Sequence, residues 1–121
     1  MSQSSNTKPY DLEERTFQFA KQVRLFIKTL VNTIANIEDS KQIIRSSGSV
    51  GANYIEANES LSKKDFLYRI KICRKESKES AYWLRLIEET NQLDNKQTVI
   101  NMIQEAIELK KIFSSIAEKS K

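Results

Sequence analysis

The chain has 121 residues, a formal net charge of +4 and a sequence pI of about 9.2, and it contains no histidine and one cysteine, Cys73. This length fits one domain whose core needs no disulfide or metal, and the single cysteine excludes an internal disulfide and a cysteine-based zinc site. No segment approaches the ~20 apolar residues that span a bilayer, so we expect no membrane association, and a lone thiol is typical of the reducing cytoplasm.

The first part of the chain predicts a tail followed by a long helix. Residues 1–10 are polar and are expected to form a disordered tail. Two glycines and one proline leave few places for turns, which favours long helices over strands. A first helix is predicted over residues 12–36, with Asp11 as its N-cap. Its apolar arc is wide enough to face two neighbouring helices and comprises Phe19, Ala20, Val23, Phe26, Ile27, Leu30, Val31, Ile34 and Ile37.

A second helix is predicted over residues 39–59, with a stripe formed by Ile44, Gly48, Gly51 and Ile55. A glycine inside a helix costs ~1 kcal/mol relative to alanine, so this glycine pair indicates that another backbone passes close by. The alternative is a local break at residues 46–49. We favour an unbroken helix because the apolar spacing continues through the pair.

The third helix carries the clearest pattern in the chain. It is predicted over residues 63–90, with Ser62 as N-cap and Asp65 in the first turn, where the helix dipole favours an acidic side chain. Its seam has the alternating four- and three-residue spacing of coiled-coil packing, at Phe66, Ile70, Cys73, Ser77, Ser80, Leu84 and Ile87. The small residues in the middle of this seam leave room for side chains of another helix.

A fourth helix is predicted over residues 95–118, with a seam at Met102, Ala106, Leu109, Phe113 and Ile116. Short links between the helices require antiparallel neighbours. The predicted fold is therefore all-α, an antiparallel up-down-up-down four-helix bundle over residues 11–119.

The sequence offers little for catalysis. The absence of histidine removes the commonest general base, and there is no glycine-rich phosphate loop. Two carboxylate pairs, Glu56 with Glu59 and Glu76 with Glu79, have the chemistry to hold a divalent metal, but we interpret them as solvated or salt-bridged surface. Cys73 is interpreted as a packing thiol. We therefore expect no catalytic residue, no cofactor and no metal, and predict that the protein is not an enzyme.

The face of the third helix opposite its seam is basic. Residues 63–78 contain seven basic side chains and two acidic ones, and Tyr68 and Tyr82 lie on the same face as the lysines. Basic residues interleaved with aromatic ones can neutralise phosphates and stack on bases. The candidate nucleic-acid contacts are Lys64, Lys71, Arg74, Lys75 and Lys78. The alternative is an ordinary solvated lysine face.

A separate apolar group on the third helix suggests a partner. Ile72, Trp83 and Leu86 lie off the seam, and exposed clusters of this kind usually mark an interface. We predict that they form an oligomer interface. One alternative is that neighbouring helices cover them, and another is that they bind a different protein, with no direct nucleic-acid role for the chain.

Two sequence blocks resemble a known family. The run Arg45–Ala57 (RSSGSVGANYIEA) is similar to a pattern of Arg, Ser four residues on, and Asn-x-x-Glu, and the run Lys75–Leu86 (KESKESAYWLRL) is similar to Lys-Glu-x-x-Glu-x-x-Tyr-Trp-Leu-Arg-Leu. These blocks resemble the bacterial four-helix bundle proteins, some of which are encoded in intervening sequences of 23S ribosomal RNA genes. They are also similar to the accessory variability determinant of diversity-generating retroelements. Gly51 and Ala57 depart from the Pro and Gly that are usual nearby.

The resemblance implies a homo-oligomeric ring, a pentamer, with a basic surface suited to RNA or DNA. It also raises a nearby-encoded protein, such as a reverse transcriptase, as a possible partner. The matched residues predict a buried polar network of Arg45, Asn53, Glu56 and Glu79, because a charge beside the core must be paired. Arg45 is expected to pair with a glutamate of this network, with Glu79 as the first candidate and Glu56 as the second. We expect the network to set helix register or subunit contacts, and a ligand site is the alternative.

Overall fold

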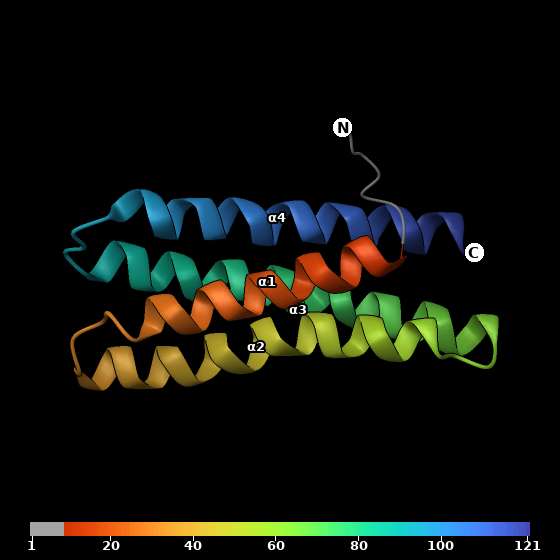
Figure 1. Cartoon of the computed structure of the whole chain (residues 1–121), viewed down its shortest axis with the longest axis horizontal. Helices are drawn as coiled ribbons and strands as arrows, with labels where there is room; N and C mark the ends of the chain where they lie inside the picture. Colours follow the sequence, from red (N-terminus) through yellow and green to blue (C-terminus); the bar gives the residue numbers. More distant parts are fainter. Residues whose placement is uncertain (1–8) are drawn as a thin grey trace.

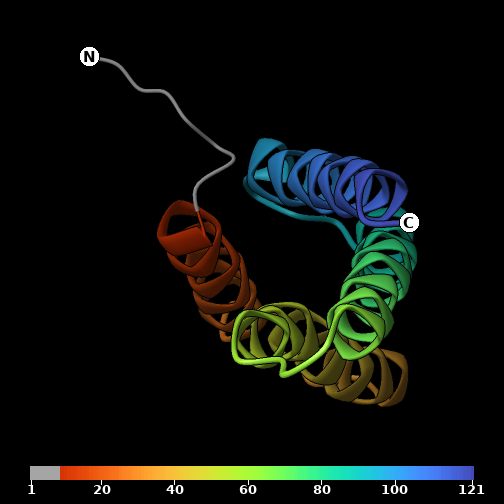
Figure 2. The ribbon, with the colours of Figure 1, turned by 90° about the vertical axis from the view of Figure 1, so that its right-hand side faces the viewer.

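Four antiparallel helices make up the computed structural model, which describes residues 9–121. They are α1 (Pro9–Ile27), α2 (Ile34–Asn58), α3 (Lys63–Thr90) and α4 (Lys96–Lys119), and they run alternately up and down (Figure 1). Viewed along the bundle, they follow one another in chain order around an arc, with α2 and α3 between α1 and α4 (Figure 2). The described part of the chain contains no strand, so the predicted all-α four-helix bundle is confirmed.

The first helix is shorter than predicted, and the second begins earlier. Residues 28–33 link the two helices, and Thr33 caps α2, with its side-chain oxygen accepting the N–H of Asn36 at 3.1 Å. Val31 and Ile34, which continue the apolar spacing of α1, are 72% and 85% exposed and pack into no core. The predicted boundary between the first and second helices, at residues 36–39, was therefore wrong. The apolar spacing of Val31 and Ile34 does not correspond to buried positions.

The start of α1 also differs from the prediction. The helix begins at Pro9, and proline suits the first helical position because its missing N–H needs no partner there. Asp11 lies in the first turn and is not the N-cap, but its charge is still favourable near the helix N-terminus. Residues 9 and 10 of the expected tail thus belong to α1, and residues 1–8 lie outside the described part of the chain.

The second helix is continuous through its two glycines, as expected, but its buried side is displaced by one residue. Ile43, Val50, Tyr54 and Ala57 are buried, whereas Ile55 is exposed. A Cβ placed on Gly51 would lie 3.0 Å from Oγ1 of Thr16 and 3.7 Å from its carbonyl carbon. The backbone of α1 therefore passes close to Gly51, as predicted. The neighbour of Gly48 is a side chain, the guanidinium of Arg24, at 3.2 Å.

The seam of α3 forms the centre of the core. Six of its seven predicted residues are buried, and Phe66 is partly buried. Ser62 caps the helix as expected, accepting the N–H of Asp65 at 3.1 Å. The small side chains let α2 approach, since Ser80 donates to Ser46 at 2.9 Å and the Cys73 thiol donates to the Val50 carbonyl at 3.4 Å.

The fourth helix begins at Lys96 and completes the core. Its N-cap is Asn95, whose side chain accepts the N–H of Thr98 at 3.3 Å. Of its predicted seam, Ile116 is partly buried and the other four residues are buried. Phe113 meets Tyr54 of α2 with ring centroids 5.7 Å apart. None of the four helices described here combines the length and apolar character needed to cross a membrane.

Candidate nucleic-acid interface

A shallow groove of about 880 Å³ runs over the outer face of α3 and the adjoining edge of α4. Because the seam of α3 turns inward, residues about half a turn away from it face solvent. The groove is lined by Tyr68, Lys71, Ile72, Arg74, Lys75, Glu76, Lys78, Lys110 and Ser114. It thus gathers four of the five predicted nucleic-acid contacts. The fifth, Lys64, is exposed near the start of α3 but does not line the groove.

The groove carries an excess of positive charge. Five of its lining residues are basic and one, Glu76, is acidic. Within residues 9–121, none of these five basic side chains forms a salt bridge, whereas Glu76 is paired with Arg45 of α2 at 3.3 Å. The local charge is therefore available to an anionic ligand.

Lys110 is a groove residue that the sequence reasoning missed. It lies on α4, next to the buried Leu109, and only the packing of α4 against α3 brings it to the groove. Its neighbours along α4 include the exposed Lys111, which does not line this groove, so charge along the chain does not distinguish the two lysines. The missing signal is which flank of α4 adjoins the outer face of α3, because the buried seam of α4 does not specify it.

Two tyrosines stand on the outer face of α3. Tyr68 lines the groove and is 61% exposed, and the guanidinium carbon of Arg69 lies 5.9 Å from the centre of its ring. Tyr82 is 56% exposed and meets Trp83 nearly edge-on, with ring centroids 5.0 Å apart. Both rings are thus accessible to a ligand, and each also contacts a neighbouring side chain.

Arg45 joins α2 to α3 beside this groove. Its Nη2 donates to the carboxylate of Glu79, the first candidate partner, and its Nη1 donates to both oxygens of Glu76 at 3.3 and 3.4 Å. Glu79 also accepts the indole N–H of Trp83 at 3.0 Å. Burial raises the pKa of Glu79, but the hydrogen bonds from Trp83 and Arg45 outweigh it and leave that pKa below its usual value. The hydrogen bond to Glu79 in turn raises the pKa of Arg45.

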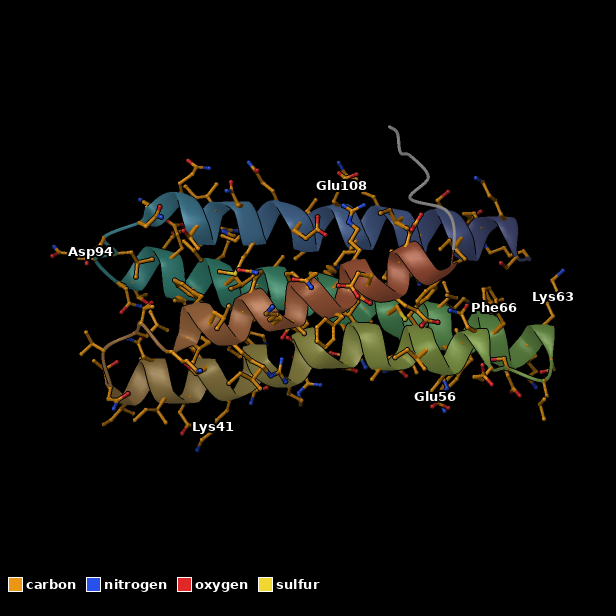
Figure 3. The ribbon with its side chains drawn as sticks, in the orientation of Figure 1. Lys41, Glu56, Lys63, Phe66, Asp94 and Glu108 are labelled. Atoms are coloured by element: carbon orange, nitrogen blue, oxygen red, sulfur yellow. The ribbon has the colours of Figure 1, made fainter. Side chains whose placement is uncertain are left out.

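The two other predicted members of the polar network, Glu56 and Asn53, form no hydrogen bond with Arg45. Glu56 is exposed on the outer side of α2 and does not reach Arg45, so its assignment as a partner was wrong (Figure 3). Asn53 belongs to a second cluster, donating to Ser49 at 2.9 Å and accepting from Arg69 of α3 at 2.9 Å. Arg45 and Asn53 both face α3 from α2. Because the two helices are antiparallel, Arg45 contacts Glu76 and Asn53 contacts Arg69, and the two residues do not form one network.

The network is also less buried than predicted. The Arg45 side chain is 50% exposed, and only Glu76 is largely shielded, at 8%. Arg45 therefore covers a buried carboxylate from the surface of the bundle, and the prediction of a buried arginine was wrong. This arrangement is physically reasonable because a guanidinium can keep part of its hydration while neutralising the acid beneath it.

The three predicted interface residues on α3 are partly buried. Ile72 lines the groove, Trp83 packs against the core, and Leu86 lies on the same flank of the helix. Other apolar side chains, on α1, the following turn and α2, are more exposed. Their exposed fractions are 44–85%, and they are Phe17, Leu25, Val31, Ile34, Ile37 and Ile55. These side chains are therefore more exposed to a partner than the three residues of the predicted interface, which are all partly buried.

The described residues provide neither a metal cluster nor an activated thiol. In residues 9–121, no three cysteine, aspartate or glutamate side chains are grouped so that they could hold a metal ion. Cys73 is buried, and burial raises its pKa to about 12. Its thiol is therefore protonated near neutral pH and suited to packing.

Comparison with known proteins agrees with this architecture. A family model described as "23S rRNA-intervening sequence protein" matches residues 9–115. The chain is also similar to the crystal structure of a protein of unknown function from the S23 ribosomal protein family of Bacteroides thetaiotaomicron. The two are 30% identical, with a TM-score of 0.75, over 87% of this chain and 96% of that one. No curated protein matches the chain.

Proposed function

The chain belongs to the family of 23S rRNA-intervening sequence proteins, and we propose that it is a non-enzymatic, cytoplasmic helix bundle that binds RNA or DNA through the groove of α3 and α4. The observation that carries this proposal is the set of five basic side chains in the groove, with no salt bridge to any residue from 9 to 121. A single free thiol supports the cytoplasmic assignment.

Binding of this kind has a measurable salt dependence. Each phosphate neutralised by a cationic side chain releases condensed counterions, so five contacts predict a slope of log affinity against log salt of about −3.5 to −4.5. Raising the salt concentration fourfold should then weaken binding by about 100- to 500-fold. Sequence preference should be small, because contacts to phosphates carry no base information.

The test is fluorescence anisotropy with labelled RNA and DNA at several salt concentrations. The variant Lys71→Gln/Lys75→Gln/Lys78→Gln removes three charges from the groove and should reduce the slope by about 2 to 3. Lys21→Gln/Lys28→Gln/Lys119→Gln is the matched control, since these exposed lysines line no part of the groove. Equal weakening in both variants would mean that net charge alone drives binding, and it would overturn the groove assignment.

We also propose that the protein assembles into a homo-oligomeric ring, with the pentamer as the expected form. The support in this structure is the set of exposed apolar side chains on α1, the following turn and α2, because contact with another copy of the chain would remove them from water. Light scattering on a size-exclusion column should give about 70 kDa, five times the 14.0 kDa of one chain. A mass of 14.0 kDa at micromolar concentration would contradict this proposal.

The alternative is a protein-interaction scaffold that uses Ile72, Trp83 and Leu86. The structure gives this alternative less support, because Trp83 packs against the core and its indole N–H is bound to Glu79. A Leu86→Ser variant separates the two functions. It should leave nucleic-acid binding unchanged under our proposal and abolish capture of a protein partner under the alternative.

A further inference from the structure

We infer that the ligand of the basic groove is a single-stranded nucleic acid whose bases stack on Tyr68 and Tyr82 while Lys71, Lys75 and Lys78 hold its phosphates. This inference rests on the proposed function and specifies the class of ligand. It starts from the positions of the two exposed tyrosines at the two ends of the lysine set on α3.

The spacing of these side chains suits an extended strand. Tyr68 and Tyr82 are 14 residues apart, which corresponds to about 21 Å along the helix and brings them within about 40° of each other around it. Lys71, Lys75 and Lys78 follow one another at intervals of four and three residues between the two rings. A strand lying along α3 therefore meets one ring, a row of cations and then the second ring.

Both rings lie at the surface and are open to a ligand. Tyr54 shows how this bundle accommodates a tyrosine in its core, since it is 4% exposed and packs on Phe113. Tyr68 and Tyr82 are more than half exposed, and each also contacts a neighbouring side chain, that of Arg69 or Trp83. An accessible aromatic ring beside a row of cations can serve as a stacking platform, because every base has an aromatic face.

The shape of the bundle disfavours a duplex at this surface. The major groove of B-form DNA is about 12 Å wide and admits one helix. Here α3 is flanked by α2 and α4 (Figure 2), and packed helices lie about 8–10 Å apart, so the combined surface is too wide to enter. The major groove of duplex RNA is narrower still. A duplex would therefore touch the lysines with its phosphates alone, whereas the unpaired bases of a single strand can reach the tyrosines.

The experiment compares four labelled ligands of one mixed sequence by anisotropy: single-stranded RNA, single-stranded DNA and the two corresponding duplexes. The full-length chain should bind a single strand more tightly than the duplex, and the tighter of the two single strands identifies the source. Tyr68→Leu and Tyr82→Leu should each weaken single-strand binding ~5- to 150-fold and leave duplex binding unchanged. Tyr68→Phe and Tyr82→Phe, which keep the ring, should retain wild-type affinity.

The outcomes separate this inference from the proposed function. If duplexes bind at least as tightly as single strands, or if the leucine variants weaken both ligands equally, the stacking inference is overturned while a lysine-dependent interface stands. If no ligand binds, or if the lysine variant of the groove binds like the wild type, the proposed function fails as well. Thermal melting of each variant, compared with the wild type, excludes unfolding as the cause of any loss.

Discussion

Asn36 of α2 and Asn91, which follows the last residue of α3, exchange two side-chain amide hydrogen bonds. The Asn36 amide donates at 2.7 Å and the Asn91 amide at 2.9 Å, and each also donates to a backbone carbonyl, that of Val31 or Ile87. The pair ties the α1–α2 turn to the end of α3. Asn36 is buried, so its loss should leave the polar groups it satisfies without a partner.

The first prediction therefore concerns Asn36→Ala. This variant should lower the free energy of unfolding by about 1–3 kcal/mol, the cost of unsatisfied buried polar groups. Urea unfolding at a fixed protein concentration measures the change. Asn101→Ala on the exposed face of α4 is the control and should stay within about 0.5 kcal/mol of the wild type. Equal stability of the two variants would show that the amide pair contributes nothing.

The second prediction is that the two helical glycines respond in opposite directions to alanine. At Gly51 the new Cβ would lie 3.0 Å from Oγ1 and 3.3 Å from Cβ of Thr16, so α1 must move and the variant should be destabilised. At Gly48 the nearest atom is the end of the flexible Arg24 side chain, which can turn away. Gly48→Ala should therefore gain up to about 1 kcal/mol from helix propensity. Melting temperatures that change in the same direction would contradict this account.

The third prediction concerns the pairing of Arg45 with Glu76 and Glu79. Arg45→Gln should reduce the free energy of unfolding by about 1–2 kcal/mol, because the shielded Glu76 loses its cationic partner while the exposed part of the interaction is screened. Arg85→Gln is the matched control, since its pair with Glu89 lies on the exposed surface of one helix. Unchanged stability and oligomer mass in Arg45→Gln would refute a structural role for the pairing.

The same site predicts a pH dependence. The folded-state pKa of Glu79 lies below its usual value, so its ionised form stabilises the fold at pH values above the pKa of this group in the unfolded chain. This contribution should be lost as the pH falls from about 4.3 through the folded-state pKa. Arg45→Gln should make the stability curve less steep in that range, as measured by urea unfolding at several pH values. Parallel curves for the variant and the wild type would exclude Arg45 as a cause of the shift.

The fourth prediction concerns the thiol of Cys73. Its pKa is raised to about 12 by burial, so only a small fraction is thiolate at pH 8. The folded protein should react with iodoacetamide far more slowly than the same protein in concentrated urea. Mass spectrometry of timed samples measures both rates. Rapid, complete labelling of the folded chain would show that Cys73 is accessible, contrary to its position in the core.

How far the sequence predicts the structure differs between helices. For α3, the cap at Ser62, the seam from Phe66 to Ile87 and the bounds 63–90 agree with the structure. For α1, the apolar spacing continues through Leu30 to Ile34, but the helix ends at Ile27. The difference is that the apolar pattern of α3 coincides with burial, whereas Val31 and Ile34 have the spacing of a core and are exposed.

The residues of the candidate site also differ in how far the sequence predicts them. The basic face of α3 follows from its own sequence, because residues opposite a buried seam must face solvent. The addition of Lys110, the choice of Glu76 over Glu56 as a partner of Arg45, and the separate cluster of Asn53 do not follow from it. Each of these contacts joins two helices.

The sequence by itself therefore determined the helical class, the bounds of α3 and the identity of its basic face, because periodicity and capping act between residues within one or two turns. Only the tertiary structure decided where α1 ends, which carboxylates Arg45 neutralises and which lysine of α4 enters the groove. Those outcomes depend on the rotation and offset of one helix against another. The rotation and the offset are set by the packing of the whole core, so no local sequence pattern predicts these contacts.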